Sequence, residues 1–323
     1  MKVGIVGLPN AGKSTLFNAL LKKRVALSAN YPFSTVEPNV GVVAVPDERL
    51  QKLAELVKVE DKMDNLPPII PAVVEFVDIA GLVKGASTGE GLGNQFLSHI
   101  REVDAIIHVI RDFSDPNIIR AGGSVNPKED KELIETELEL ADLDKQSLPS
   151  KEGKVDKLST KPVLYVYNVD EKNYPVILNG VKNISFADAQ DDSLFICAKL
   201  EEELADLTEE ERKQYLSELG IHETGLERLI KAAYKLLGLI SFLTAGKKEV
   251  RAWTVKDGTN AQQAAGVIHT DFIKGFIRAQ VIEYEKLIEA GSYGNAKLKG
   301  WIRTEGRDYL VKDGDVIEFL VSS

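Results

Sequence analysis

The chain contains 323 residues, a length that suits two domains better than one. Hydrophobic residues make up 44% and charged residues 28%, as in soluble globular proteins, and no apolar run approaches the ~20 residues that span a bilayer. The net charge of −10 argues against a general polyanion binder, because counterion release needs clustered Lys and Arg, so we expect neither membrane nor DNA binding. The single cysteine and the non-basic N-terminus are typical of a cytoplasmic protein.

The first two thirds of the chain alternate strand and helix patterns. Strands are predicted at residues 3–6, 73–78, 105–110, 163–168 and 194–198. Helices are predicted around residues 14–22, 95–103, 129–144, 201–219 and 224–237. Strands linked by helical crossovers predict a mostly parallel sheet with helices on both faces, which is an α/β fold. The acidic helices are expected to be solvated, and the polar residues 145–161 to form a connector.

The pattern changes after about residue 240. Short strands at residues 249–255, 275–281 and 316–320 surround one helix at 260–268, which predicts a small α+β domain. Residues 241–323 carry 12 Lys and Arg against 11 Asp and Glu, so most of the negative charge lies before them. Any nucleic-acid contact is therefore expected to be local and to lie in this part of the chain.

A phosphate-binding loop is predicted at Gly7-Leu-Pro-Asn-Ala-Gly12-Lys13-Ser14, between the first strand and the first helix. Glycine lets the chain curl tightly enough to turn its N–H groups inwards, and the helix N-terminus adds positive potential. Lys13 is expected to contact the β- and γ-phosphates, Ser14 to ligate Mg²⁺, and Thr15 to reach the α-phosphate. The predicted nucleotide contacts here are Asn10, Ala11, Gly12, Lys13, Ser14 and Thr15.

Two further segments are predicted to read the γ-phosphate and the metal. Asp78-Ile-Ala-Gly81 ends a strand, so Asp78 is expected to hold Mg²⁺ through water and the Gly81 amide to face the γ-phosphate. Thr35 lies in a long loop and is a second candidate Mg²⁺ ligand, with Ser34 as its rival.

The group that activates the attacking water is left open by the sequence. Leu82 stands where many GTPases carry a glutamine, and a leucine cannot orient water. The candidates are His99, His108, Arg101, Arg111, Arg120 or a bound ion, although His108 is more simply a histidine packed on a strand. Asn10 is positioned in the sequence to help bind K⁺ beside the phosphates.

The predicted base-reading loop departs from the guanine pattern Asn-Lys-x-Asp. The chain has Asn168-Val169-Asp170-Glu171, so the lysine is replaced by Val169 and the aspartate by Glu171. Losing a charged bidentate contact costs roughly 1.5–3 kcal/mol, which removes a guanine preference and favours adenine. Backbone groups near Asn168 and Val169, and around Cys197 and Ala198, are the predicted adenine contacts, although Cys197 is also typical of a small buried residue.

Taken together, these segments resemble the YchF / Obg-like ATPase family over nearly the whole chain. The resemblance rests on residues 7–14, 30–39, 78–87, 89–96, 245–255, 269–272, 275–280 and 309–315. It implies an Obg-type G domain, predicted at residues 1–219, followed by a TGS domain of the ubiquitin-like β-grasp type at 240–321. It also implies an intracellular protein that hydrolyses ATP, often in preference to GTP, and associates with ribosomes.

The chain departs from this family in two places. Members usually carry a long helical coiled coil, whereas the insertion here, about residues 129–161, is short. Relatives often have a proposed catalytic histidine where this chain has Arg120, which can stabilise transition-state charge but cannot act as a base near neutral pH.

The leading hypothesis is therefore an Mg²⁺-dependent ATPase that acts as a ribosome-associated nucleotide switch. The alternatives are a GTPase translation factor on the same fold, or an adaptor that binds ribosomal RNA and uses nucleotide only for regulation. Lys297, Lys299, Arg303 and Arg307 form a candidate basic patch for such an adaptor, unless they belong to an ordinary solvated surface.

Overall fold

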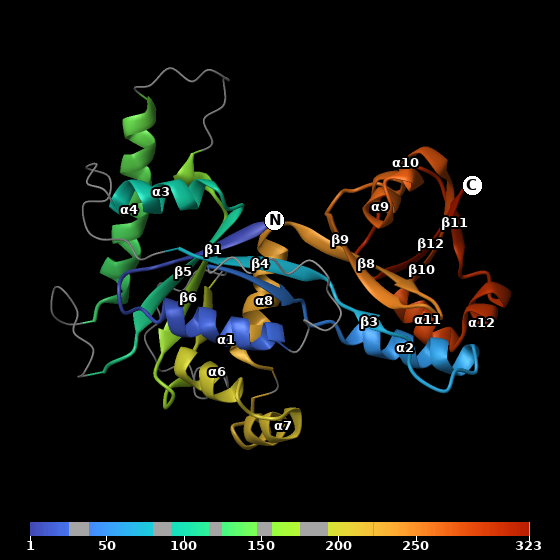
Figure 1. Cartoon of the computed structure of the whole chain (residues 1–323), viewed down its shortest axis with the longest axis horizontal. Helices are drawn as coiled ribbons and strands as arrows, with labels where there is room; N and C mark the ends of the chain where they lie inside the picture. Colours follow the sequence, from blue (N-terminus) through green and yellow to red (C-terminus); the bar gives the residue numbers. More distant parts are fainter. Residues whose placement is uncertain are drawn as a thin grey trace. The chain divides into compact units, whose positions relative to one another are not determined.

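The computed structural model describes residues 1–25, 39–79, 92–115, 125–146, 157–174, 193–221 and 223–322. These residues form two compact units, each built on its own six-stranded sheet (Figure 1). The first unit comprises residues 1–43 and 74–237, and the second comprises residues 44–73 and 238–323. None of the described helices has both the length and the apolar character needed to cross a bilayer.

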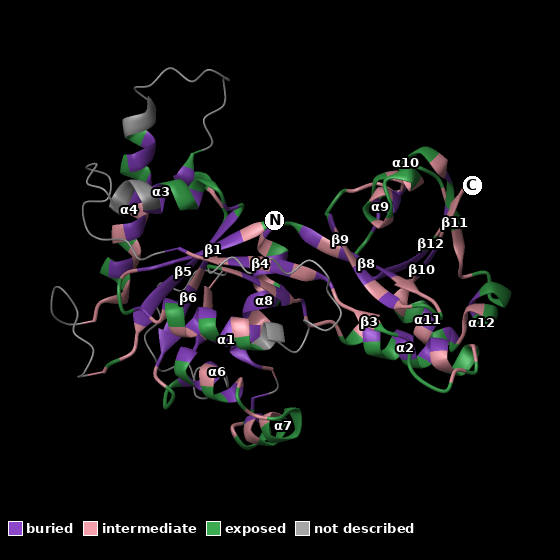
Figure 2. Ribbon diagram, viewed as in Figure 1, coloured by how far each residue is buried: buried purple, intermediate pink, exposed green. Residues whose placement is uncertain are grey.

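The sheet of the first unit has the strand order β2-β4-β1-β5-β6-β7. Its strands are β1 (Lys2–Val6), β2 (Val40–Ala44), β4 (Val73–Asp78), β5 (Ala105–Asp112), β6 (Val163–Val169) and β7 (Ser193–Ile196). The pairings β4–β1, β1–β5, β5–β6 and β6–β7 are all parallel. Seven of the eight residues of the central strand β5 are buried, as expected for a strand inside a parallel sheet, and they include the polar residues His108 and Arg111 (Figure 2).

The helices of the first unit are α1 (Lys13–Val25), α3 (Leu92–Arg101), α4 (Pro127–Gln146), α6 (Ala198–Leu204), α7 (Glu209–Glu218), α8 (Gly225–Leu236) and the 3₁₀ turn η2 (Leu158–Thr160). A reciprocal cap between Thr224 and Glu227 starts α8, which packs against β5, β6 and β7. The unit therefore continues to Leu237, beyond the boundary at residue 219 that the sequence suggested.

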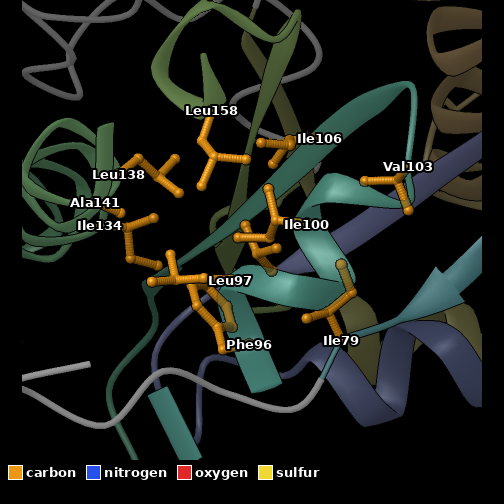
Figure 3. Close-up of a cluster of buried hydrophobic side chains, with 11 residues drawn as sticks. Ile79, Phe96, Leu97, Ile100, Val103, Ile106, Ile134, Leu138, Ala141 and Leu158 are labelled. Carbon is orange, nitrogen blue, oxygen red and sulfur yellow. The ribbon is translucent and has the colours of Figure 1, made fainter. Parts of the chain in front are cut away.

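Helix α4 presents the solvated face that its acidic composition predicts, with Glu132 and Glu139 exposed, but it also buries another face. Its residues Ile134, Leu138 and Ala141 are buried and pack with Ile100 of α3 and Ile106 of β5 (Figure 3). An acidic helix can bury one narrow apolar stripe and keep its other faces in water, which composition alone does not reveal.

The shortened insertion is closed at its base. Near the end of α4, the carboxylate of Asp142 accepts hydrogen bonds from the backbone N–H groups of Leu158, at 2.8 Å, and Ser159, at 2.9 Å. These bonds lower the pKa of Asp142 against the opposing effect of burial. The two ends of the insertion are thus held together on either side of residues 147–156, which lie outside the described part of the chain.

The second unit has a mixed sheet with the order β11-β10-β12-β8-β9-β3. Its strands are β3 (Ile69–Ile70), β8 (Leu239–Ala245), β9 (Val250–Lys256), β10 (Phe276–Glu283), β11 (Arg303–Glu305) and β12 (Asp315–Val321). Its helices are α2 (Glu48–Glu60), α9 (Ala261–Ile268), α10 (Asp271–Gly275), α11 (Tyr284–Ala290) and α12 (Tyr293–Leu298). Helix α9 packs its alanines onto Phe242 and Ala279, which gives the α+β core expected for this part of the chain.

Residues 44–73 belong to the second unit, whereas the sequence analysis assigned them to the first domain. The reason is packing. Helix α2 buries the apolar residues Leu50, Leu53, Ala54, Leu56 and Val57 and contacts β8, β9 and α11. Strand β3 pairs in parallel with β9, with Ile69 opposite Val250 and Ile70 opposite Arg251.

Candidate functional site

A cavity of about 810 Å³ lies in the first unit, among segments that follow four of its parallel strands. The lining residues come from four segments: 10–15 after β1, 113–115 after β5, 168–173 at the end of β6, and 197–202 after β7. In open parallel sheets, ligands bind outside the carboxyl ends of the strands, and this cavity occupies that position.

The phosphate loop turns tightly at the start of α1. Gly12 has φ = 96°, and a Cβ atom there would lie 2.2 Å from Nδ2 of Asn168, so only glycine fits. Asn10 adopts a left-handed conformation with φ = 64°. Asn10, Gly12, Lys13, Ser14 and Thr15 line the cavity as expected, while Ala11 is buried and presents its backbone to Asn168.

Lys13 and Asp78 form the charged centre of this region. Lys13 is buried, and its ammonium donates a hydrogen bond to the Leu8 carbonyl at 2.9 Å. Burial lowers the pKa of Lys13 and raises the pKa of Asp78, and the attraction between the two charges opposes both shifts. Oδ1 of Asp78 is buried without a hydrogen-bond partner among the described residues, as expected for an oxygen placed to face a cation or its water.

Asn168 connects two of the segments that line the cavity. Its Nδ2 donates to the Ala11 carbonyl at 3.0 Å, and its Oδ1 accepts from the Ala198 N–H at 2.9 Å. The side chain is buried. Asn168, predicted as a base contact, thus commits one donor and one acceptor to holding the phosphate loop against the start of α6.

The remaining base-side residues lie where β6 and β7 end. Val169, Cys197 and Ala198 line the cavity although all three residues are almost completely buried. Strand β7 ends at Ile196 and Cys197 caps α6, which corrects the predicted strand 194–198. Burial raises the pKa of the Cys197 thiol, in keeping with a small packed residue.

Glu171 is partly exposed at the rim of this cavity. Its carboxylate lies 4.0 Å from the ammonium of Lys199. The two side chains are 45% and 72% exposed, so the pair has room to rearrange around a bound base.

None of the described candidates for activating water is among the residues that line the cavity. His108 is fully buried on β5, and burial together with Lys131 and Lys13 lowers its pKa to about 3, so it stays neutral. Arg111 is buried, donates from Nε to the Phe113 carbonyl at 3.2 Å and stacks over that ring at 4.6 Å. His99 and Arg101 are exposed on α3, away from the cavity lining. Thr35, Gly81, Leu82 and Arg120 lie outside the described residues.

The sequence analysis missed residues 113–115, which form one wall of the cavity. The Ser114 N–H donates to Oδ2 of Asp170 at 3.4 Å, so this wall adjoins the base-reading loop. Phe113 adds an aromatic residue to a lining that is mostly polar and charged, with Val169, Cys197 and Ala198 as further apolar members. The sequence feature that could have identified Phe113 is its position directly after the central strand, at the edge of the sheet where the other loops of the site meet.

Comparisons with known proteins agree with this geometry. The family model described as "50S ribosome-binding GTPase" matches residues 2–168, and the YchF-GTPase C-terminal model, described as "Protein of unknown function (DUF933)", matches residues 239–322. A protein from Bacillus subtilis (strain 168) named "Ribosome-binding ATPase YchF" is 46% identical over 369 residues, covering 99% of this chain and 98% of that protein. Its namesake from Escherichia coli O157:H7 is 47% identical with the same coverage.

A solved structure shows the same architecture. The structure of the Schizosaccharomyces pombe YchF GTPase superposes with a TM-score of 0.80 at 34% identity, and covers 99% of this chain and 97% of that one. This likeness confirms the predicted fold, in which a P-loop α/β unit is accompanied by a smaller C-terminal unit. The identity to full-length relatives confirms the resemblance drawn from the motifs, and the chain belongs to the YchF family.

Proposed function

We propose that this protein hydrolyses ATP in the cavity of the first unit and associates with ribosomes in a nucleotide-dependent way. The observation that carries the proposal is the convergence of the phosphate loop and the Asn168 loop on one cavity, with the Asp78 carboxylate close enough to act electrostatically on Lys13 of that loop. The names of the bacterial relatives support ATP as the substrate and the ribosome as the partner. A ribosome-associated role implies a cytoplasmic location.

The described residues fit a nucleotide bound with Mg²⁺. The Ser14 hydroxyl lines the cavity, and the unpartnered Oδ1 of Asp78 supplies a second oxygen of the type that Mg²⁺ binds directly or through water. The ion, when bound, would neutralise charge on the β- and γ-phosphates. Lys13 would contact the same phosphates and Thr15 the α-phosphate. The proposal also gives roles to three further residues. Thr35 would be another Mg²⁺ ligand, the Gly81 amide would face the γ-phosphate, and Arg120 would stabilise charge in the transition state.

Lys13 provides the test of hydrolysis. Lys13→Ala should abolish ATP turnover, because a buried positive charge beside the phosphates is lost. Lys22→Ala is the matched control, since Lys22 lies in the same helix but pairs with Asp206 at 2.7 Å on the surface. Phosphate release should fall to background only in the first variant, and retained turnover in Lys13→Ala would exclude the assigned site.

Adenine preference is proposed from the base-side loop. Val169 stands where a guanine-binding loop has the lysine that packs along the base. The Glu171 carboxylate lies beside the Lys199 ammonium, so it is not an isolated acceptor for a guanine base. Calorimetry with ATP and GTP in Mg²⁺ should show tighter ATP binding. A tenfold preference for GTP would instead favour the GTPase that the fission yeast protein's name describes.

A monovalent cation is proposed as a further activator. Asn10 lines the cavity with the left-handed backbone of the phosphate loop, and K⁺ beside the phosphates can take the place of an arginine finger. Turnover should be faster in KCl than in NaCl at equal ionic strength, and Asn10→Ala should remove the difference. Equal rates in the two salts would argue against K⁺.

Ribosome association is proposed to involve basic residues of the second unit. Arg303 is already engaged, since its Nη2 donates to the Tyr309 hydroxyl at 3.1 Å and lies 3.7 Å from Asp315. Lys297, Lys299 and Arg307 are exposed and remain as candidates. Sedimentation with ribosomes in ATP, ADP and no nucleotide tests the switch, and binding that ignores the nucleotide would contradict it.

A further inference from the structure

The chain passes between the two units three times, and two of these crossings flank residues 44–73. The segment leaves the first unit where β2 ends at Ala44 and returns where β4 begins at Val73. Just beyond these ends, the Val45 N–H donates to the Ala72 carbonyl at 2.8 Å. This hydrogen bond holds the two crossings beside each other, and we call the pair of crossings the neck.

Residues 44–73 are an integral part of the second unit. The Val250 N–H donates to the Pro68 carbonyl at 2.9 Å, which starts the β3–β9 pairing. At the end of α2, in the middle of the segment, Glu60 accepts hydrogen bonds from the N–H groups of Tyr293 and Gly294 at 2.9 and 3.1 Å. A displacement of this segment must therefore disturb hydrogen bonds whose donors are fixed in the body of the second unit.

The strands that enter the neck begin or end at the candidate metal site. Asp78, the last residue of β4, is the carboxylate that faces Lys13, and its N–H donates to the Asn39 carbonyl directly before β2. Strand β4 then spans about 17 Å from Asp78 to Val73, since an extended chain rises about 3.3 Å per residue. Paired in parallel with β1, it is held as a stiff element instead of a slack tether.

We propose that residues 44–73 transmit the occupancy of the nucleotide site to the second unit. Binding at Asp78 favours one position of β2 and β4, and because both strands continue directly into the segment, α2 and β3 respond in their contacts with β9 and α12. The inference rests on the proposed function, since it requires nucleotide and Mg²⁺ at Asp78. The coupled element is one continuous stretch of chain, in which residues 44–73 of the second unit are joined directly to β2 and β4 of the first.

Hydrogen exchange measured by mass spectrometry on the full chain tests the proposal. Exchange is compared without nucleotide, with Mg²⁺–ADP, and with Mg²⁺ plus a non-hydrolysable ATP analogue. The amides of Val250, Tyr293 and Gly294 should change their exchange rate by about fivefold or more between the analogue and ADP. The amides of Ala261 and Val311 are controls, because they bond to Tyr309 and Thr259 within the second unit and should not respond.

An insertion variant isolates the route. Two glycines inserted between Ala44 and Val45, and two between Ala72 and Val73, loosen the neck but leave the packing of α2 and β3 unchanged. The nucleotide should still bind, while the exchange difference at Val250 disappears. A difference that persists would place the coupling elsewhere, at the third crossing near residue 238, and overturn the proposal.

The wild-type protein alone distinguishes the two levels of failure. If calorimetry shows that nucleotide binds but Val250 and Tyr293 exchange at the same rate in every state, the coupling through residues 44–73 is wrong and the nucleotide site stands. If no nucleotide binds, the proposed function itself is wrong.

Discussion

The two units treat their buried polar groups differently. Within the described residues, five buried side-chain atoms have no hydrogen-bond partner, and all five belong to the first unit: Asp78 Oδ1, His108 Nε2, Ser193 Oγ, Arg212 Nε and Arg228 Nε. In the second unit, the buried carboxylate of Asp315 instead accepts from the Tyr309 hydroxyl at 2.7 Å and the Lys312 N–H at 2.9 Å. Among its described residues, the first unit thus leaves buried polar atoms without partners, at residues that are not among those lining the cavity, whereas the second satisfies the buried carboxylate of Asp315 internally.

The largest effect that separates the units should come from a glycine substitution. Gly12→Ala places a Cβ atom against Asn168 in a left-handed backbone, which should lower the free energy of unfolding by about 3 kcal/mol and abolish nucleotide binding. Urea unfolding and calorimetry measure both effects. Gly246→Ala in the second unit is the control, because no atom lies within 4 Å of the added Cβ, and should change stability by less than about 0.5 kcal/mol.

The next effect concerns the bridge across the cavity. Asn168→Ala removes two hydrogen bonds and leaves the Ala11 carbonyl and Ala198 N–H without them, which should cost about 2–3 kcal/mol of stability and weaken ATP binding about tenfold. Asn168→Asp keeps the acceptor for Ala198 but turns a buried carboxylate oxygen towards the Ala11 carbonyl, so it should be no more stable than the alanine variant. Equal ATP affinity in all three proteins would show that the bridge does not order the site.

The sequence predicts a structural feature of either unit when that feature is caused by residues close together in the chain. The phosphate loop was predictable because Gly12, Lys13 and Ser14 act within one turn whose requirements are set by backbone conformation and charge. The alternation of strands and helices likewise predicts the parallel sheet. The placement of α2 was not predictable, since an amphipathic helix shows that it has a buried face but not which sheet covers that face.

In the candidate site, too, contacts between residues distant in the chain could not be predicted from the sequence. The sequence places Asn168 after a strand, but its bonds to Ala11 and Ala198 join residues 157 and 30 positions apart in the chain. Phe113 was missed for a related reason, because an aromatic residue after an apolar strand is equally typical of a core. Only the meeting of β5 and β6 at one edge places it in the cavity wall.

A third variant tests the internally satisfied network of the second unit. The guanidinium of Arg49 donates from Nε and Nη2 to Asp47, both at 2.8 Å, and from Nη1 to Asp313 at 2.7 Å. Arg49→Lys keeps the charge but cannot form this fork, so stability should fall by about 1–2 kcal/mol, as measured by urea unfolding. Arg278→Lys, at an exposed position on β10, is the control and should be neutral. A neutral Arg49→Lys would mean that the fork adds nothing beyond its charge.

The smallest expected effect is on the pH dependence of the free energy of unfolding, to which one carboxyl group in each unit contributes with opposite sign. Burial and the nearby Asp170 raise the pKa of Asp112 from 3.8 to about 6, so the folded first unit retains a proton that the unfolded chain releases. The free energy of unfolding should therefore fall as the pH rises from about 4 to about 6, by less than about 1 kcal/mol per pH unit for this partly exposed group.

Two matched variants read out this sign from urea unfolding at pH 4–7. The hydrogen bond from Lys286 lowers the pKa of Glu283 in the second unit, so its contribution is lost as the pH falls. Relative to the wild type, Asp112→Asn should gain stability as the pH rises through about 6, whereas Glu283→Gln should lose it as the pH rises through the glutamate range. The titration of His108 is common to the wild type and both variants and cancels in the differences. The same slope in both variants would contradict the distinction between the first unit, where burial raises the pKa of a carboxyl group, and the second, where a hydrogen bond from a lysine lowers one.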